Sequence, residues 1–256
     1  MIVYRSRNEM ETMDRCNRVV TAILASLARM VAPGITTMDL EHAADRMCRE
    51  ARVKPAFKGY RGYPCVLCAS VNEEVVHGIP SPKKVLREGD IVGLDFGVVM
   101  DGYYGDAAIT VPVGRVSPPA RDLMRVTRES LDRGIAMARV GNRLSDVSAA
   151  IQEHVESRGY SVVREFVGHG IGTSLHEDPQ VPNYGTPGMG PLLKEGLVLA
   201  IEPMVNAGRP EVRVQSDGWT ASTIDGSLSA HFERSVAITQ DGPWILGGDT
   251  GAIEGA

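Results

Sequence analysis

The sequence has few aromatic residues, few cysteines and no long apolar run. Aromatic residues make up 5% of the 256 residues, and the four cysteines all lie in the first third of the chain. A chain of this size does not need disulfide bonds for stability, so we expect reduced thiols. No apolar stretch approaches the ~20 residues that span a bilayer, and the chain does not begin with the basic-then-apolar order of a secretory signal. We therefore expect a cytoplasmic protein without membrane contact.

An excess of positive charge is also missing. The formal net charge is −5 at pH 7, which gives no general signal for binding nucleic acid. Apolar residues make up 43% and charged residues 23%, the proportions of an ordinary globular protein. The length fits one large domain, or two halves that share a core. We predict a single domain over residues 1–256, with a short N-terminal helical lead and a tail that frays after about residue 246.

Cys65 and Cys68 form a lone CxxC pair. A structural zinc ion needs a second pair of ligands, and the other two cysteines do not offer one at a suitable spacing. Small apolar side chains in or beside a strand are therefore the favoured interpretation of this pair.

Apolar residues recur at helical spacing in four segments, each bounded by residues that favour a helix end. Thr36, with Asp39 three residues later, is predicted as an N-cap, and Ser145 as another. The predicted helices cover residues 8–31, 36–52, 118–138 and 145–159. Residues 63–99 are richer in Val, Ile and Gly and are predicted to form strands, with turns at Asn72-Glu73 and Glu88-Gly89.

The two helix pairs resemble copies of one another. A shift of 107 residues places Gly34 on Gly141 and Asp39 on Asp146, so the order helix, turn, helix, strand occurs twice. Two capped helices can agree this far by chance, but the repeat favours two related α+β halves around a shared sheet. A site between such halves would take its ligands from both.

The segment 88–114 places two aspartates where water should be excluded. It predicts two strands joined by Asp101-Gly102, a dipeptide typical of tight hairpin turns. With a two-residue turn, Asp95 lies opposite Ala108, and Asp106 points to the same face. The residues around the two aspartates are apolar at both odd and even positions of the strands. This predicts that both faces of the hairpin are covered by other parts of the protein. Burying a carboxylate costs several kcal/mol unless a cation or good donors compensate, and two on one face also repel each other.

A positive charge is therefore expected between these two carboxylates. The segment 88–114 contains no lysine or arginine that could supply it. From the two aspartates alone, a metal ion and a buried arginine from elsewhere are equally good explanations. One aspartate could also form a turn at the edge of the sheet.

Three later residues favour the metal. His169 stands between glycines, which let backbone or substrate approach its ring. Glu202 follows an apolar strand and precedes Pro203, which holds it extended. Glu233 lies in another alternating strand, where a surface ion pair with Arg234 is the alternative. With the two aspartates, these acids carry four negative charges, which two divalent cations would balance. Oxygen ligands with one imidazole suit Mn(II), Fe(II), Co(II) or Zn(II).

Seven motifs occur in order over about 70% of the chain, from Tyr60 to about Val236: GYRGYPCVLCASVNEEVVHGIP, DIVGLDFGVVMDGYYGDAA, FVGHGIG, LHEDPQVPNYG, IEPMVNAG, DGWT and SAHFERSV. Through them the chain resembles the type I methionine aminopeptidases. The resemblance implies the pita-bread fold, an α+β fold in which pseudo-twofold duplicated halves pack helices on a curved antiparallel sheet. It also implies an enzyme that removes the initiator methionine of nascent proteins and favours a small second residue.

The resemblance further implies a dinuclear centre. Asp95 would chelate one metal, Asp106 and Glu233 would bridge both, and His169 and Glu202 would complete the other site. Hydroxide formed between the two ions would attack the first peptide bond, with Glu202 moving its proton to the leaving amine.

Two histidines and an apolar pocket complete the implied site. His176 would stabilise the oxyanion, and His77 would contact the scissile amide or help to transfer the proton. The residues implied to line or adjoin the methionine pocket are Tyr60, Tyr63, Cys68, Leu175 and Trp219. Leu175 departs from several bacterial relatives that carry an aromatic residue there. The histidines that match no motif residue, and that we expect on the surface or in packing, are His42, His154 and His231.

Three other classes of protein share parts of this pattern. Prolidases and aminopeptidase P have the same ligands but usually carry a large N-terminal domain, for which Asp95 comes too early. Type II methionine aminopeptidases insert a helical subdomain between the positions of His169 and Glu202, where this chain is short. A metal-free binding protein of this fold would be recognised by metal analysis. The family implies a monomer that acts on nascent chains and allows transient association with the ribosome.

Overall fold

The computed structural model describes residues 1–248, which form four α-helices, one 3₁₀ turn and fifteen strands. The helical elements are α1 (Arg7–Met30), α2 (Thr37–Ala51), the 3₁₀ turn (Tyr60–Gly62), α3 (Pro118–Met137) and α4 (Leu144–Glu156). The strands are β1 (Lys54–Pro55), β2 (Leu67–Val71), β3 (Glu74–Val76), β4 (Ile91–Met100), β5 (Tyr103–Pro112), β6 (Ser161–Val162), β7 (Gly168–Gly170), β8 (Glu177–Val181), β9 (Val198–Ile201), β10 (Met204–Asn206), β11 (Val212–Val214), β12 (Ala221–Thr223), β13 (Ser229–His231), β14 (Glu233–Thr239) and β15 (Gly242–Ile245). The tail predicted to fray lies, from residue 249 on, outside the described residues.

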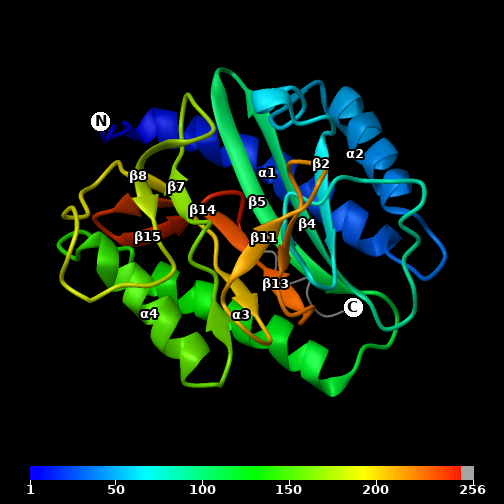
Figure 1. Cartoon of the computed structure of the whole chain (residues 1–256). Helices are drawn as coiled ribbons and strands as arrows, with labels where there is room; N and C mark the ends of the chain where they lie inside the picture. The colour runs from blue at the N-terminus through cyan, green and yellow to red at the C-terminus, as the bar shows by residue number, and fades with distance from the viewer. Residues whose placement is uncertain (249–256) are drawn as a thin grey trace.

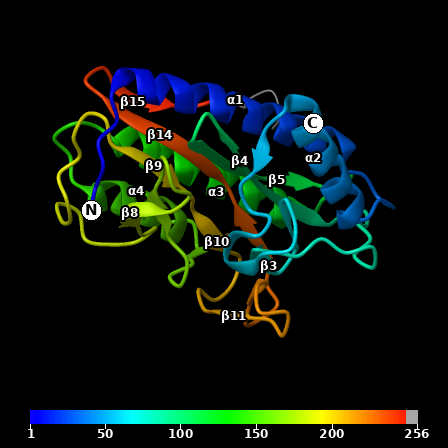
Figure 2. The ribbon, with the colours of Figure 1, turned by 90° about the horizontal axis from the view of Figure 1, so that it is seen from above.

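Nine strands form one antiparallel sheet, in which β1, β4, β5, β14, β9, β7 and β8 follow one another. Strand β2 pairs with β4, and β15 pairs with β14. The long hairpin of β4 and β5 runs through the middle of the molecule (Figure 1). Seen from above, α1 lies along the sheet on the side away from β3 and β11 (Figure 2). Helices therefore cover one face of the sheet, in the predicted α+β arrangement.

The predicted N-cap at Thr36 is confirmed. Its hydroxyl accepts a hydrogen bond from the backbone N–H of Asp39 at 3.1 Å, and the Asp39 carboxylate accepts from the backbone N–H of Thr36 at 2.8 Å. Each side chain thus satisfies a donor that the first turn leaves without a partner.

The predicted N-cap at Ser145 is wrong. Helix α4 begins one residue earlier, at Leu144, and the backbone N–H of Arg143 donates to the Asp146 carboxylate at 2.7 Å. The Ser145 hydroxyl instead donates to the carbonyl of Met189 at 2.7 Å and accepts from its N–H at 2.6 Å. The Ser145 hydroxyl therefore bonds to the backbone of a distant loop and does not cap the helix. The helix also ends at Glu156, before the predicted Gly159.

The repeat with an offset of 107 residues is present in the backbone. Gly34 and Gly141 both have positive φ, +96° and +93°. Their N–H groups donate to carbonyl groups that are again 107 residues apart, Leu86 at 2.8 Å and Leu193 at 3.1 Å. In the sheet, β5 pairs with β14, so the hairpin of the first half lies beside strands of the second. The two halves meet at this pair of strands.

Burial fixes which face of the hairpin carries the aspartates. Leu94, Phe96 and Val98 are fully buried in the main core and alternate with Asp95 along β4. Because a slip of one residue would move all three away from the core, the register is strongly specified. The hairpin turn is the predicted one, since Met100 pairs with Tyr103 across two residues of positive φ.

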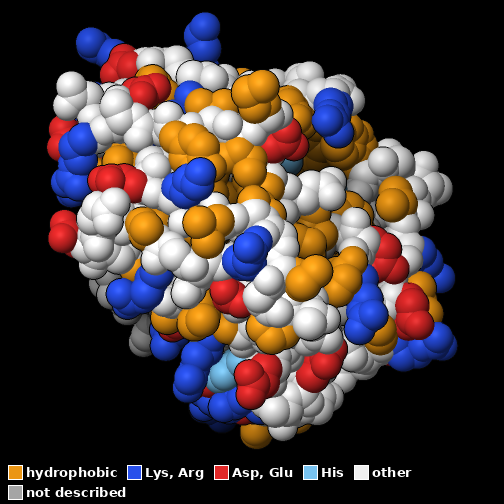
Figure 3. Space-filling model, turned by 90° about the vertical axis from the view of Figure 1, so that its left-hand side faces the viewer, with side chains coloured by type: hydrophobic (Ala, Val, Ile, Leu, Met, Phe, Trp, Pro, Cys, Tyr) orange, Lys and Arg blue, Asp and Glu red, His pale blue; other side chains and the backbone are white. Residues whose placement is uncertain are grey.

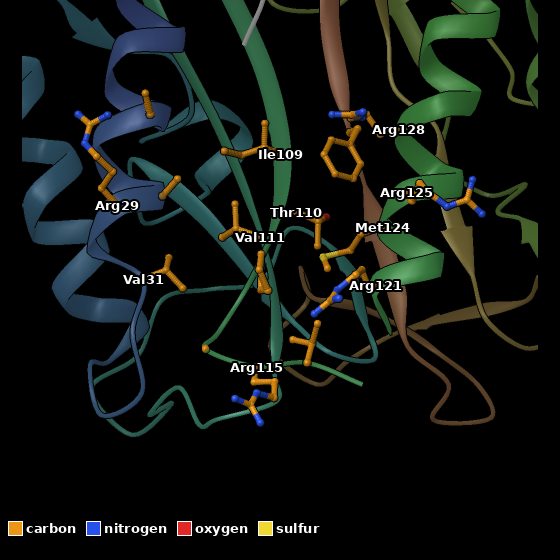
Figure 4. A pocket seen from close by; sticks show the side chains of 16 residues that line it. Arg29, Val31, Ile109, Thr110, Val111, Arg115, Arg121, Met124, Arg125 and Arg128 are labelled. Atoms are coloured by element: carbon orange, nitrogen blue, oxygen red, sulfur yellow. The ribbon is translucent and has the colours of Figure 1, made fainter. Parts of the chain in front are cut away.

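A groove of about 1160 Å³ opens between α1 and α3 (Figure 4). Ile109 and Val111 of β5 lie in it, and both have the parity opposite to Asp106. Its arginines, shown in Figure 4, are Arg29, Arg115, Arg121, Arg125 and Arg128. This groove therefore lies on the face of the sheet away from the aspartates.

The surface carries charges of both signs. On the face shown in Figure 3, basic and acidic side chains are interspersed among apolar ones. Within residues 1–248, no helix has the length and apolar character required to cross a bilayer. The four cysteines are free and buried, as expected for reduced thiols, and Cys68 lies in β2.

Candidate metal centre and active site

Three strands place two carboxylates on either side of one alanine. Asp95 of β4 pairs with Ala108 of β5, as predicted, and Ala108 pairs with Glu233 of β14. Residues directly opposite each other in antiparallel strands share a face, so Asp95 and Glu233 flank the Ala108 methyl group. Asp106, two residues before Ala108, points to the same face. The small side chain of Ala108 leaves space between the carboxylates.

His169 and Glu202 approach this row from the neighbouring strands. The Nε2 atom of His169 lies 3.5 Å from Glu202 Oε1 and 4.0 Å from Asp106 Oδ2. Ligand atoms of Asp106, His169 and Glu233 all lie within 4.8 Å of one another, and all three residues are buried. The structure thus brings the five predicted ligands together from both halves of the chain.

The glycines around His169 have a backbone role. A Cβ atom on Gly168 would lie 2.4 Å from the carbonyl oxygen of Ala200, and one on Gly170 would lie 2.2 Å from that of Asp178. Only glycine lets β7 pass this close to its neighbours. The glycines thus let neighbouring backbone approach β7 on both sides of His169.

The orientation of the His169 ring fixes its tautomer. Its Nδ1 atom lies 2.9 Å from the carbonyl oxygen of Gly170, which can only accept a hydrogen bond, so Nδ1 carries the hydrogen. Burial lowers the pKa of His169 to about 3, and the imidazole is therefore neutral. Its Nε2 lone pair is left facing the carboxylates, which is the state that binds a metal ion.

Burial and mutual repulsion disfavour the charged forms of the four acids. Burial, the largest cause, raises the pKa of Asp95 to about 6 and raises the pKa values of Asp106, Glu202 and Glu233 well above their ordinary values. Their mutual repulsion adds to this for the last three. One oxygen each of Asp95, Asp106 and Glu233 is buried without a hydrogen-bond partner. Carboxylate oxygens without hydrogen-bond partners, together with a neutral imidazole, form a set of ligands that suits divalent cations.

The surface ion pair considered for Arg234 is wrong. The residue is only 6% exposed, and its guanidinium donates to the backbone carbonyl of Glu233 at 2.8 Å. As neighbours on one strand, the two side chains point to opposite faces of the sheet.

Two more histidines border the carboxylate cluster. The ring of His176 lies 4.3 Å from the ring of His169, and its Nδ1 is 2.7 Å from the hydroxyl of Tyr60. The ring of His77 lies 6.2 Å from Trp219, edge to face, and its backbone has a positive φ of 60°. Burial lowers the pKa of His77 to about 4 and also lowers that of His176, so both rings are neutral near pH 7.

The five residues expected at the methionine pocket belong to one apolar cluster, which contains Tyr60, Tyr63, Cys68, Leu175 and Trp219. Tyr63 and Trp219 meet edge to face with ring centres 5.1 Å apart. Cys68 pairs with Asp95 across the sheet, so the cluster directly adjoins the carboxylates. Ile171, one residue after β7, and Cys65, two residues before β2, also belong to it.

One residue near the carboxylates was missed. His231, which was expected on the surface or in packing, is only 3% exposed, and its Nε2 atom lies 3.6 Å from Glu202 Oε2. Its place two residues before Glu233 in the sequence could have indicated that it lies near the carboxylates. Of the other two histidines, His42 is exposed, and His154 packs with its Nε2 atom 3.1 Å from Glu129.

The comparisons with known proteins agree with this geometry. The model of metallopeptidase family M24 matches residues 11–240. A methionine aminopeptidase of Clostridium acetobutylicum is 51% identical over 96% of this chain and 98% of its own length. Methionine aminopeptidase 1 of Bacillus subtilis is 48% identical over 96% of this chain and 99% of its own.

Solved structures give the same result. The crystal structure of methionine aminopeptidase from Thermotoga maritima has a TM-score of 0.95 and 51% identity, covering 97% of this chain and all of that one. A prolidase of Pyrococcus horikoshii has a TM-score of 0.77 at 19% identity and shares the fold, with 64% of its length covered. These matches confirm the pita-bread fold. The chain therefore belongs to metallopeptidase family M24, among the methionine aminopeptidases.

Proposed function

We propose that this protein is a metalloaminopeptidase that removes the initiator methionine of nascent proteins and favours a small second residue. The observation that carries the proposal is the meeting of four carboxylates, largely removed from water, and a neutral histidine beside an apolar pocket. The names of the relatives, which are 48–51% identical over almost the whole chain, support the same activity.

Two divalent cations, Co(II), Mn(II), Fe(II) or Zn(II), would balance the four carboxylates. Asp95 would chelate one, Asp106 and Glu233 would bridge both, and His169 and Glu202 would complete the second position. When bound, such ions lower the pKa of water toward neutrality and polarise the scissile carbonyl. The free amino group of the substrate would be held on the Asp95 side, which explains a preference for terminal residues.

The side chains around the cluster would carry the proton and the developing charge. Glu202 accepts the proton of the attacking water and delivers it to the leaving amine. His176, which is exposed at the edge of the cluster, donates to the oxygen that becomes negative. His77 contacts the scissile amide or assists the proton transfer.

The apolar cluster would hold the methionine side chain. Tyr60, Tyr63, Cys68 and Trp219 offer an apolar, unbranched slot beside Asp95. Leu175 also lies in the slot and is smaller than an aromatic residue, which widens that wall. One methylene in such a pocket changes discrimination by only about 1–3 kcal/mol, so shape adds to hydrophobicity.

The proposal extends to the cellular setting. We infer a single catalytic domain that acts as a monomer in the cytoplasm on nascent chains, with transient association with the ribosome. We infer no specificity for nucleic acid, because the net charge of −5 gives no general signal for it.

A peptide panel tests this function. We expect the purified protein with added Mn(II) or Co(II) to release methionine from Met-Ala-Ser, while Leu-Ala-Ser and Ala-Pro-Ser are cut at least about 10-fold more slowly. Chelator should stop all cleavage. Chelator-resistant cleavage, or equal rates on Ala-Pro-Ser, would contradict the proposal.

Replacing His176 with alanine should lower kcat by about 10²–10³-fold, because one donor to the oxyanion is lost. Metal content should stay at the wild-type level, since His176 is not among the five grouped ligands. Turnover of Met-Ala-Ser and metal analysis of the same preparation measure the two quantities. His42→Ala, which changes an exposed histidine, is the control. Unchanged turnover in His176→Ala would remove that residue from the mechanism.

A further inference from the structure

His231 has a position that its packing alone does not require. Its backbone is fixed to β5, because its N–H donates to the hydroxyl of Thr110 at 2.9 Å and that hydroxyl donates to its carbonyl at 2.8 Å. His231 ends β13, and Glu233 begins β14 two residues later. The distance of 3.6 Å from the His231 Nε2 atom to Glu202 Oε2 places the ring beside the carboxylates. Its Nε2 atom is buried and has no hydrogen-bond partner within residues 1–248. A buried polar atom without a partner is costly, so its direction is informative.

The Nε2 atom of His231 faces one particular oxygen. It lies 3.6 Å from Glu202 Oε2, whereas His169 Nε2 lies 3.5 Å from Glu202 Oε1. Each oxygen of Glu202 thus faces a different imidazole. Oε1 lies beside the nitrogen of His169 that would bind the metal. Oε2 points away from that nitrogen and toward His231.

The carboxylate of Glu202 depends on such contacts for its orientation. The backbone at this residue is held by Pro203 and by the side chain of Asn183, whose Nδ2 atom donates to the Glu202 carbonyl at 3.0 Å. In the described part of the chain, the carboxylate itself accepts no hydrogen bond within normal distance. The last torsion of a glutamate side chain is broad and roughly two-fold, so backbone restraint leaves the two oxygens free to exchange.

We propose that His231 is a positioning residue for Glu202. Its Nε2–H donates to Oε2 and leaves Oε1 directed toward the metal side, with a closure of a few tenths of an ångström from the present separation. Donors behind a carboxylate ligand set its orientation and affect metal affinity as well as activity. This inference rests on the proposed function, because it takes Glu202 as one of the residues that would hold the metal.

Four variants test the inference. His231→Gln keeps an N–H donor at nearly the same reach, His231→Asn has a donor that is too short, and His231→Leu has none. His154→Leu is the matched control, since His154 is also buried and also faces a glutamate, Glu129, but lies on α4. The readouts are the dissociation constant for Mn(II) by titration calorimetry, and kcat and KM for Met-Ala-Ser.

We expect His231→Leu and His231→Asn to bind Mn(II) about 10–100-fold more weakly and to lose kcat by a similar factor, with little change in KM. His231→Gln and His154→Leu should stay within about 3-fold of wild type in both quantities. If His231→Leu does not fold, the comparison of Gln with Asn decides, because both are polar and differ in reach.

The inference is overturned if a folded His231→Leu or His231→Asn variant matches wild type, or if His231→Gln is as impaired as His231→Asn. Failure of the proposed function gives a different pattern. In that case wild type itself does not cleave Met-Ala-Ser, or Glu202→Gln binds Mn(II) and cleaves as wild type does.

Discussion

Replacing Glu233 with glutamine is expected to abolish metal binding and to lower turnover of Met-Ala-Ser on the order of 10³-fold or more. Glu233 is 2% exposed and lies opposite Ala108 on the strand where the two halves meet. The neutral amide removes one of four charges and one oxygen that would bridge both ions. Metal content after dialysis and turnover at saturating Mn(II) measure the effect.

A matched control separates this effect from the loss of one negative charge anywhere on the protein. Glu153→Gln makes the same change at an exposed position of α4 and should leave metal content and turnover unaltered. A Glu233→Gln protein that keeps both ions and more than a tenth of the wild-type rate would show that Glu233 is not a bridging ligand.

Removing the metal should destabilise the protein strongly. Cations at about 1,000 times their dissociation constant stabilise the native state by about 4 kcal/mol. In a chain of this size this corresponds to a fall of roughly 8–16 °C in the unfolding midpoint when chelator is added. The four carboxylates then lose the charge that balances them, and one oxygen of three of them has no hydrogen-bond partner.

The destabilisation should be larger at pH 8 than at pH 5.5. Without metal, the pKa values of the four acids in the folded state lie above their ordinary values, that of Asp95 at about 6. At these four acids the folded apoprotein therefore binds more protons than the unfolded chain, so their contribution to its stability falls as pH rises through this window. Burial lowers the pKa of His169 to about 3 and of His77 to about 4, so both are neutral in the folded protein at either pH.

Thermal unfolding with and without chelator, at both pH values, measures this difference. A shift that is equal at pH 5.5 and pH 8, or larger at the lower pH, would show that the buried acids do not carry the stabilisation. Asp146→Asn is a suitable control, because this acid caps α4 at the surface and should not change the metal-dependent shift.

Local patterns predicted the carboxylate hairpin well. The alternation of apolar residues along β4 and the turn at Asp101-Gly102 together fix a register that places Asp95 opposite Ala108. Both signals lie within one short segment, and burial on the helix-covered face leaves no other register. The cost of burying the acids then indicated a cation before any relative was considered.

Contacts between distant segments were harder to predict. Nothing near Ser145 in the sequence indicates that Met189 will take its hydroxyl. In the same way, the pairing of Ala108 with Glu233 and the approach of His231 to Glu202 depend on how β5 meets β14. Such pairings join residues far apart in the chain, and single-segment periodicity carries no information about them.

The offset of 107 residues that relates Gly34 to Gly141 also relates Asp95 to Glu202. An exact repeat would place the same acid at both positions, and this chain does not. One position now has the shorter aspartate, and the other has the longer glutamate with two imidazoles beside it. The two halves thus bring an acid to matching positions, but the different side-chain lengths and neighbouring rings make the two sides of the cluster chemically unequal.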